Sequence, residues 1–341
     1  MTNHTASGFT SARLISATAC GILRSTMASR ILVVYYSQTG QLTRIARSML
    51  APLGARDDVK IDWHEIVPRP AYPFPWSFLS FLDAFPESVY LDPPAVAPGG
   101  IGADANYDLI VLAYQVWFLA PSLPMTGFLH SPTAGVLKGK RVITVIGCRN
   151  MWTTAHQSMV DLLAAAGARI ADNIVFTDAG PMWSTFITTP WWLLTGNKGP
   201  LLGLLPAAGV SARDIERASR FGRALADALP DIAKGAPGPF LRGLAAVKVN
   251  PHTMLAERIG HRSFRVWGKL LRALGKPGSA LRKPVLCIYA VFLVAMILTA
   301  LPITASIAYM FARFSNRVRE RADVLEAPSG SSGERLAVYD Q

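Results

Sequence analysis

The stretch from Ile31 to Thr43 constrains the fold most, because an apolar strand runs directly into a short polar turn that opens a helix. Residues 31–36 are aliphatic or aromatic throughout, which is typical of a strand buried on both faces. The apolar side chains of residues 44–50 then follow helical spacing. A strand, a glycine-bearing turn and a helix in this order predict an α/β protein whose first loop can hold a phosphate.

This first loop offers several donors to a phosphate. Backbone N–H groups at a helix N-terminus are unpaired, and the helix dipole favours an anion there. Gly40 lets the backbone approach a ligand closely. An ordinary turn with a helix N-cap is the alternative for so short a motif. We predict phosphate contacts along the whole loop: Ser37, Gln38, Thr39, Gly40, Gln41, Leu42 and Thr43.

Two further buried strands also end in loops of polar and aromatic residues. Residues 107–113 are predicted to form a second buried strand, which ends in the segment 114–122. Residues 140–146 form another that ends in the segment 147–152. In doubly wound sheets, ligands bind beyond the carboxyl ends of the strands. The three loops are therefore expected to share one site.

This order of strands and loops resembles the flavodoxin-like family over roughly residues 30–180. The resemblance implies a doubly wound α/β sheet of five parallel strands, with residues 59–67 as the second strand and 168–177 as the last. It also implies FMN as the cofactor, with its phosphate in the first loop and its isoalloxazine ring between the other two. The family often has a hydroxyl residue at the place of Leu42, and this chain has one at Thr43. The ring contacts implied are Gln115, Val116, Trp117, Phe118, Cys148, Arg149, Asn150 and Trp152.

Neither the N-terminus nor the cysteines indicate an exported or metal-binding protein. Residues 1–29 are rich in Ser, Thr and Ala, and their apolar patch is too interrupted for a secretory signal. We predict a disordered or over-extended N-terminus, since Met27 opens a compact segment that could itself be the start. The three cysteines, at 20, 148 and 287, have neither metal-ligand spacing nor a disulfide framework. A reducing cytosolic compartment and no metal site are therefore expected.

Two apolar insertions interrupt the flavodoxin-like domain, which we expect to cover residues 30–235 and to close with a helix over 211–229. Residues 70–98 combine many prolines with a dense set of aromatics, which suits a wall over a flat ligand or a surface resting on lipid. A loop packed on the domain's own core is the alternative. Residues 181–205 are too apolar for a free loop and too broken for a membrane span. They either cover an apolar substrate channel or dip into a membrane interface.

The segment 236–284 contains a basic amphipathic helix that indicates an anionic membrane surface. A net charge of +12 would also suit nucleic acid, but the apolar segment that follows argues for a membrane, so we expect no nucleic-acid partner. The basic residues repeat at steps of three and four: Arg258, Arg262, Arg265, Lys269, Arg272 and Lys276. The opposite face carries Ile259, Val266, Trp267, Leu270, Leu271 and Leu274.

Residues 285–311 contain no charged residue, and about 20 such residues suffice to cross a hydrocarbon core of roughly 30 Å. We predict a transmembrane helix kinked at Pro302, with a re-entrant hairpin as the alternative. Basic residues are denser before this segment than after it, which places the flavodoxin-like domain on the cytoplasmic side of the cell membrane. Residues 312–341 are expected to be a polar, disordered tail.

The insertions and loop sequences look closest to bacterial proteins described as dialkylresorcinol condensing enzymes. That resemblance implies a role in alkylresorcinol lipid synthesis beside a ketosynthase partner. Condensation would need an activated cysteine, for which Cys148 and His156 are the one candidate pair. We expect instead FMN-dependent oxidation of a dialkylcyclohexanedione to the resorcinol, with no base identified. A membrane-bound quinone reductase and a non-enzymatic electron carrier or scaffold are the alternatives.

Overall fold

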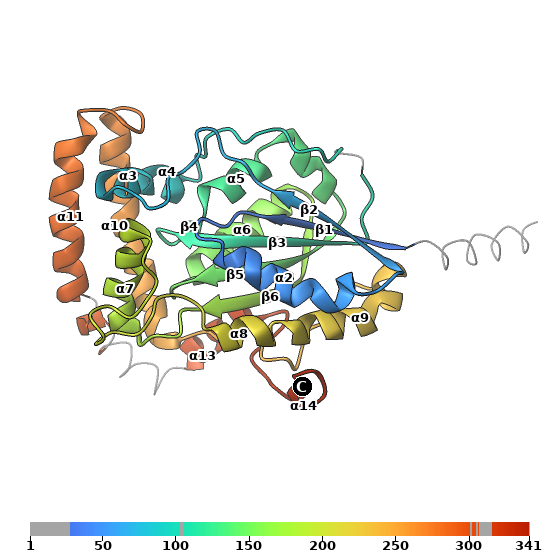
Figure 1. Cartoon of the computed structure of the whole chain (residues 1–341). Coiled ribbons are helices and arrows are strands. Elements are labelled where there is room, and N and C mark those ends of the chain that lie inside the picture. Colours follow the sequence, from blue (N-terminus) through green and yellow to red (C-terminus); the bar gives the residue numbers. More distant parts are fainter. Residues whose placement is uncertain (1–27, 103–104, 301, 305, 307–315, 341) are drawn as a thin grey trace, which may run out of the picture.

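The computed structural model describes residues 28–102, 105–300, 302–304, 306 and 316–340, with the backbone alone at 316–319. Most of the N-terminal segment 1–29 and part of the apolar segment 285–311 therefore lie outside the described residues. The centre of the molecule is a parallel sheet in the order β2-β1-β3-β5-β6 (Figure 1). These strands are β1 (Ser29–Tyr35), β2 (Val59–Glu65), β3 (Leu109–Trp117), β5 (Arg141–Cys148) and β6 (Arg169–Thr177).

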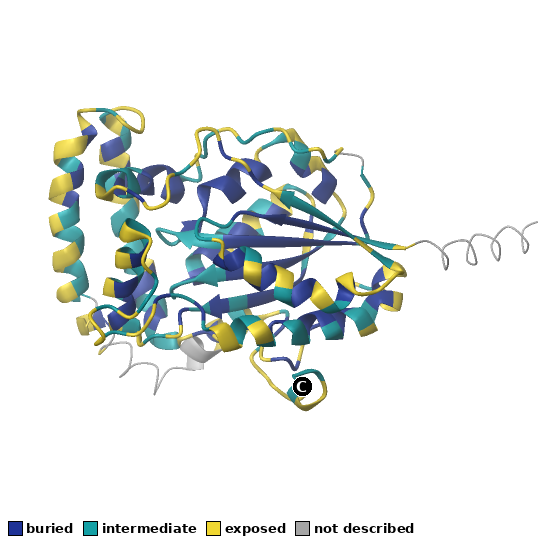
Figure 2. Cartoon of the chain, in the orientation of Figure 1, coloured by how far each residue is buried: buried dark blue, intermediate teal, exposed yellow. Residues whose placement is uncertain are grey.

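This strand order is that of the flavodoxin-like doubly wound fold, so the predicted fold is confirmed. In the register, Ile31 pairs with Leu109 and Ile110 pairs with Val142. The central strands are buried on both faces, as their predominantly apolar sequences predicted (Figure 2). A short β4 (Ala120–Pro121) adds an antiparallel pair to the end of β3.

Helices cover both faces of the sheet. One face carries α2 (Gln41–Gly54), against which α8 (Ala212–Arg217) and α9 (Ser219–Ala233) pack. On the other face lie α5 (Leu123–Leu129) and α6 (Thr153–Ala165), with a 3-10 turn, η1 (Pro132–Leu137), after α5 (Figure 1). The closing helix predicted over 211–229 is thus two helices, and Ser211 caps the first by accepting a hydrogen bond from the Asp214 N–H at 3.0 Å.

The two insertions supply helices at the carboxyl end of the sheet. The first contains α3 (Phe78–Asp83) and α4 (Phe85–Tyr90), and the second contains α7 (Met182–Thr195). At the same end of the molecule lie α10 (Pro251–Ala273) and α11 (Arg282–Leu298), which form a hairpin (Figure 1). Within the described residues, one helix, Arg282–Thr304, is by length and composition long and apolar enough to cross a membrane.

Residues 236–250 do not form the membrane-surface segment that was predicted for them. The backbone N–H groups of Phe240 and Leu241 donate to the buried Asp172 carboxylate at 2.8 and 3.1 Å, and Leu241, Leu244 and Val247 join the main core. This stretch therefore completes the edge of the sheet beside β6. The prediction was wrong for this stretch because the pattern of basic and apolar residues that indicates a membrane surface begins only at Arg258, in the helix α10.

The C-terminal tail is also more ordered than its composition predicted. It contains α13 (Asn316–Glu326) and α14 (Leu336–Tyr339). The Ser329 hydroxyl donates to Asp172 Oδ1 at 2.8 Å, and the Ala245 N–H donates to the Ser332 carbonyl at 2.7 Å. The guanidinium of Arg217 forms an ion pair with Asp340. Long-range polar contacts of this kind hold a segment that lacks a core of its own.

Candidate functional site

The three predicted loops meet at the carboxyl end of the sheet. The Gln38 N–H in the first loop donates to Gln115 Oε1 in the second at 3.0 Å. The Gln38 side-chain amide donates to the Pro73 carbonyl of the first insertion at 2.6 Å, and its oxygen accepts from the Tyr36 hydroxyl. One glutamine therefore joins two loops and an insertion.

The first loop has the geometry of an anion cradle at the start of α2. Gly40 adopts a left-handed conformation (φ 73°), and an added Cβ would meet open space there. Among the described residues, the backbone N–H groups of Thr39, Gly40, Gln41 and Thr43 have no hydrogen-bond partner. These free donors point to an anionic ligand, as the sequence predicted for this turn.

Three side chains of the first loop make contacts within the protein. Ser37 Oγ accepts from the Leu42 N–H at 3.1 Å, so it acts as a helix cap. Gln41 is buried, accepting from the Val210 N–H at 3.1 Å and donating to the Val210 carbonyl at 3.3 Å. The Leu42 side chain lies in the main core. Gln41 can therefore offer only its backbone N–H to a ligand, and the contact predicted for Leu42 has no free donor, because its N–H is bound to Ser37.

A cavity of about 320 Å³ opens beside the loops, which is at the lower end of the usual range for small-molecule sites. Seven of the predicted residues line it: Gln38, Gln115, Val116, Trp117, Phe118, Arg149 and Asn150. Its other walls come from both insertions, with Trp76, Phe81, Thr185, Phe186 and Leu193, and from the α10–α11 hairpin, with Ile259, Phe264, Phe292, Met296 and Ala300. The cavity is therefore polar at the loops and apolar toward α11.

The loop after β3 is held in place by aromatic packing. Trp117 makes edge contacts with Tyr72 and Trp76, at ring-centroid distances of 5.0 and 5.7 Å. Phe118 and Leu119 both have positive φ, at 51° and 64°, a left-handed conformation that is unfavourable for a residue with a Cβ. Strained backbone of this kind is concentrated at functional sites.

Arg149 is the only charged side chain among the described residues that line the cavity. Its guanidinium stacks over Phe186 at 3.9 Å, and one nitrogen donates to Thr185 Oγ1 at 3.2 Å. No carboxylate of the described residues forms an ion pair with it, and burial lowers the pKa of Arg149 to about 10. The side chain still carries its charge at neutral pH. A partly buried cation without a direct ion-pair partner favours an anionic or carbonyl-bearing ligand.

Two residues of the third loop do not contact the cavity. The Trp152 side chain is 2% exposed and packs in the core against His156, so the prediction of a ring contact for it is wrong. The Cys148 thiol donates to the Phe176 carbonyl at 3.8 Å, and burial raises the pKa of that thiol. Burial also lowers the pKa of His156 to about 4. A neutral thiol and a neutral imidazole without mutual hydrogen bonds are not an activated nucleophile.

Sequence reasoning missed the contribution of α10 behind the third loop. The buried Glu257 carboxylate accepts from the Thr153 hydroxyl and from the Thr154 N–H at 3.2 Å, at the start of α6. Burial raises the pKa of Glu257. This carboxylate holds α10 against the loop that carries Arg149, and it does not line the cavity. A single Glu within a basic helix was the one signal that could have shown this contact.

No protein-family model matches the chain, and no curated protein matches its sequence. Among solved structures, the chain is similar to a flavoprotein in complex with FMN from Lactobacillus acidophilus NCFM, at 16% identity and a TM-score of 0.35, covering 43% of this chain and 93% of that one. It is similar to a flavodoxin from the domain Archaea at 13% identity and a TM-score of 0.29, covering 61% and 98%. For two-electron reduced Megasphaera elsdenii flavodoxin the values are 15%, 0.26, 42% and 84%. The flavodoxin-like architecture is given by the strand order of this chain itself.

Proposed function

We propose that the chain is a membrane-associated, FMN-dependent oxidoreductase that oxidises a dialkylcyclohexanedione to the corresponding resorcinol. The observation that supports this best is the cavity, which joins the first, second and third loops to an apolar wall at the carboxyl end of the sheet. An electron carrier or scaffold of this fold would have no use for such a wall.

The residues present fit FMN. The free N–H groups around Gly40 suit a monophosphate, and the hydroxyls of Thr39 and Thr43 are half-buried beside them. Gln115 and Asn150 offer amides to the edge of a flat ring, and Arg149 offers a positive charge. When bound, FMN would supply the hydride chemistry. The chain itself would hold the cofactor, exclude water and orient the substrate.

The cavity also suits an acidic cyclic diketone as substrate. No carboxylate, imidazole or amine is among the described side chains that line it, so a strong general base is absent from this wall. A cyclic 1,3-diketone ionises readily, and Arg149 would stabilise its enolate oxygen. Conversion to the resorcinol would then transfer one hydride from the ring to FMN and release one further ring proton to water. The alkyl chains would lie toward α10 and α11, where the lining is apolar.

A quinone reductase is the second candidate. The same absence of a base favours it, because quinone reduction needs no proton abstraction from carbon and Arg149 would stabilise the hydroquinone anion. Both readings draw an apolar substrate from a membrane. A ketosynthase partner and a cytoplasmic orientation of the domain stay predictions.

The decisive experiment is anaerobic and optical. The protein is purified in detergent, its visible spectrum is recorded, and the oxidised form is mixed with a dialkylcyclohexanedione while the reduced form is mixed with a quinone. Bleaching of the flavin with formation of a resorcinol supports the first reading, and reoxidation by quinone alone supports the second. Absence of flavin after reconstitution refutes both.

A further inference from the structure

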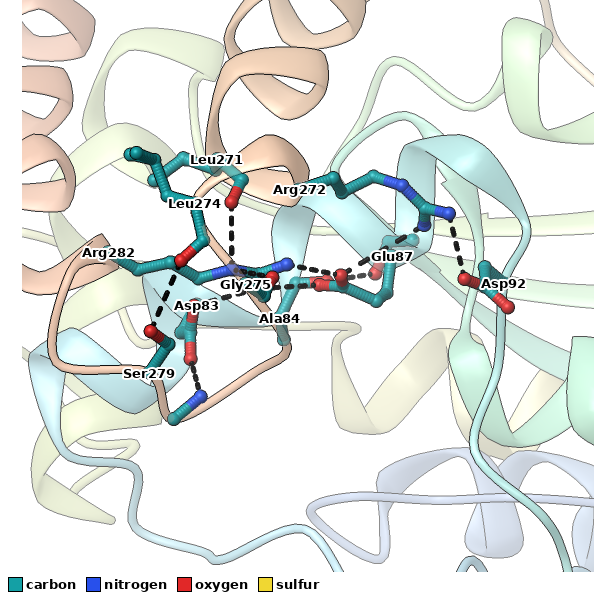
Figure 3. A network of polar contacts seen from close by, with 12 residues as sticks. Asp83, Ala84, Glu87, Asp92, Leu271, Arg272, Leu274, Gly275, Ser279 and Arg282 are labelled. Carbon is teal, nitrogen blue, oxygen red and sulfur yellow. Dashed lines mark hydrogen bonds and ion pairs between the residues drawn. The ribbon is translucent and has the colours of Figure 1, made fainter.

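The start of α11 is bound to the α/β body by a buried ion-pair network (Figure 3). The Arg282 side chain is 1% exposed, and its guanidinium donates to Asp83 Oδ1 at 3.1 Å and to Glu87 Oε1 at 2.7 Å. It also donates to the Leu271 carbonyl at 3.0 Å. Both carboxylates belong to the first insertion. The apolar helix therefore begins inside the protein, on the same body as the sheet.

One face of α11 stays packed along the helix. Tyr289 lies 4.3 Å from Phe85 by ring centroids, and Phe292 lies 5.2 Å from Trp267. Further on, Ile297 and Ala300 line the cavity together with residues of α7. The helix thus runs beside the protein over most of its length, as Figure 1 shows.

The chain that follows α11 also belongs to the same body. Glu326 Oε1 at the end of α13 accepts from the Val249 N–H at 3.0 Å, and Ser329 reaches Asp172 under the sheet edge. A single crossing by the helix Arg282–Thr304 would put the chain that follows it on the far side of a hydrocarbon core of roughly 30 Å from the sheet. A single crossing is therefore incompatible with the packed tail.

The outer face of α11 is nevertheless apolar and bare. Ile288, Val291, Val294 and Leu298 are 61%, 72%, 55% and 70% exposed and form one stripe at helical spacing. Across the hairpin, Val266 and Leu270 of α10 extend this apolar surface. Next to them around α10 come exposed basic residues: Arg258, Arg262, Arg265 and Lys269. We call these ten residues, four from α11 and six from α10, the α11 face.

We propose that the α11 face is a monotopic membrane-docking surface, with α11 lying in the plane of one leaflet of an anionic bilayer and not crossing it. An apolar band bordered by cations matches acyl chains bordered by anionic headgroups. The cavity behind α11 would then open into the leaflet that supplies its substrate. The opening of the cavity into the leaflet rests on the proposed function, whereas membrane attachment itself needs no flavin.

The first test is topological. In a variant with Cys20, Cys148 and Cys287 replaced by serine, Ala280→Cys marks the chain before α11 and Glu334→Cys marks the tail. Both positions are exposed. Each variant is reconstituted into vesicles and treated with a membrane-impermeant maleimide before and after lysis. Labelling of both positions from the same side is expected. Labelling from opposite sides would overturn the proposal and restore the transmembrane helix.

The second test concerns the partner. The full chain with Val291→Gln and Val294→Gln is compared in flotation assays with vesicles of phosphatidylcholine alone and of an equimolar mixture with phosphatidylglycerol. Two exposed valines on the tail, Val324→Gln and Val338→Gln, are the matched control. We expect the first pair to lower partitioning by on the order of tenfold or more, and the control pair to leave it unchanged.

Unchanged flotation of the Val291→Gln, Val294→Gln protein would overturn the proposal. So would a detergent-free wild-type protein that forms a discrete dimer and ignores both vesicles, since a second copy would then cover the face. Bound flavin is measured by absorbance in every variant. Loss of attachment with flavin retained therefore separates a failure of docking from a failure of the proposed function.

Discussion

Replacement of Arg149 by methionine tests the assignment of the cavity most directly. Methionine keeps much of the side-chain volume and removes the charge that faces the ligand. A hydrogen bond to a charged group contributes about 1.5–3 kcal/mol, and each 1.4 kcal/mol is tenfold in affinity. The affinity for an enolate or phenolate ligand should therefore fall by roughly 10- to 150-fold.

The free energy of unfolding of the Arg149→Met variant should change little or even rise. Burial lowers the folded-state pKa of Arg149 to about 10, so the unfolded chain binds the proton more tightly than the folded one. The charged arginine therefore costs folding free energy at neutral pH, and this cost decreases as the pH rises from the folded pKa of about 10 toward the unfolded pKa. For the wild type, binding of an anionic ligand should be constant from pH 7 to 9 and fall above about pH 10.

The assay is anaerobic calorimetric titration of a dialkylcyclohexane-1,3-dione, which is ionised at neutral pH, into the detergent-solubilised protein with its flavin reduced. Thermal melting is measured in parallel. Arg169→Met, an exposed arginine at the start of β6, is the matched control and should change neither quantity. An unchanged affinity in Arg149→Met would refute the reasoning and move the ligand away from this end of the cavity. Lost affinity with a much lower melting temperature would instead show a structural role.

Three further predictions follow from other parts of the molecule. Thr39→Ala with Thr43→Ala should weaken FMN binding by about 1.5–3 kcal/mol for each lost bond to the phosphate, measured by flavin fluorescence, and equal affinity would place the phosphate elsewhere. Arg282→Met removes the only cation paired with Asp83 among the described residues and leaves Glu87 with Arg272 alone, at 4.0 Å, so the free energy of unfolding should fall by about 3–5 kcal/mol in a urea titration. The exposed Arg56→Met should have little effect. Equal stability of these two variants would show that the network does not hold α11. Ser263→Trp narrows the apolar end of the cavity, so turnover should fall for long-chain more than for short-chain substrates at unchanged flavin content, and a chain-length-independent loss would contradict this placement.

The sheet could be predicted from sequence because its strands are buried on both faces. The predicted strands at 31–36, 107–113 and 140–146 overlap β1, β3 and β5, and the residues that they share with these strands are mostly apolar. The cavity residues of the second loop followed from their position after β3. Trp152 could not be placed in this way, because the turn at Met151, with φ 54°, directs the next side chain into the core.

The contacts between distant segments had no local signal. The sequence predicted α10 and α11 as two separate membrane elements. A basic stripe on one helix and an apolar run in the next do not indicate that the two helices pack against each other. Glu87 and Asp83 lie in an aromatic insertion, and Arg282 lies almost 200 residues away, in a pairing that neither local stretch indicates. The tail was expected to be disordered because its composition is polar. Its order depends on Asp172, a buried carboxylate in β6.

That carboxylate makes completion of the sheet edge a late event in synthesis. Asp172 accepts hydrogen bonds from Phe240, Leu241 and Ser329, and the last of these residues leaves the ribosome only when the chain is almost finished. Until then, one hydrogen-bond donor to this buried carboxylate is missing. A truncation before Ser329, the obvious way to obtain a detergent-free domain, would freeze the chain in this unfinished state. A soluble form is better sought by replacing the exposed apolar residues of α11 with polar ones while keeping every residue after Asn316.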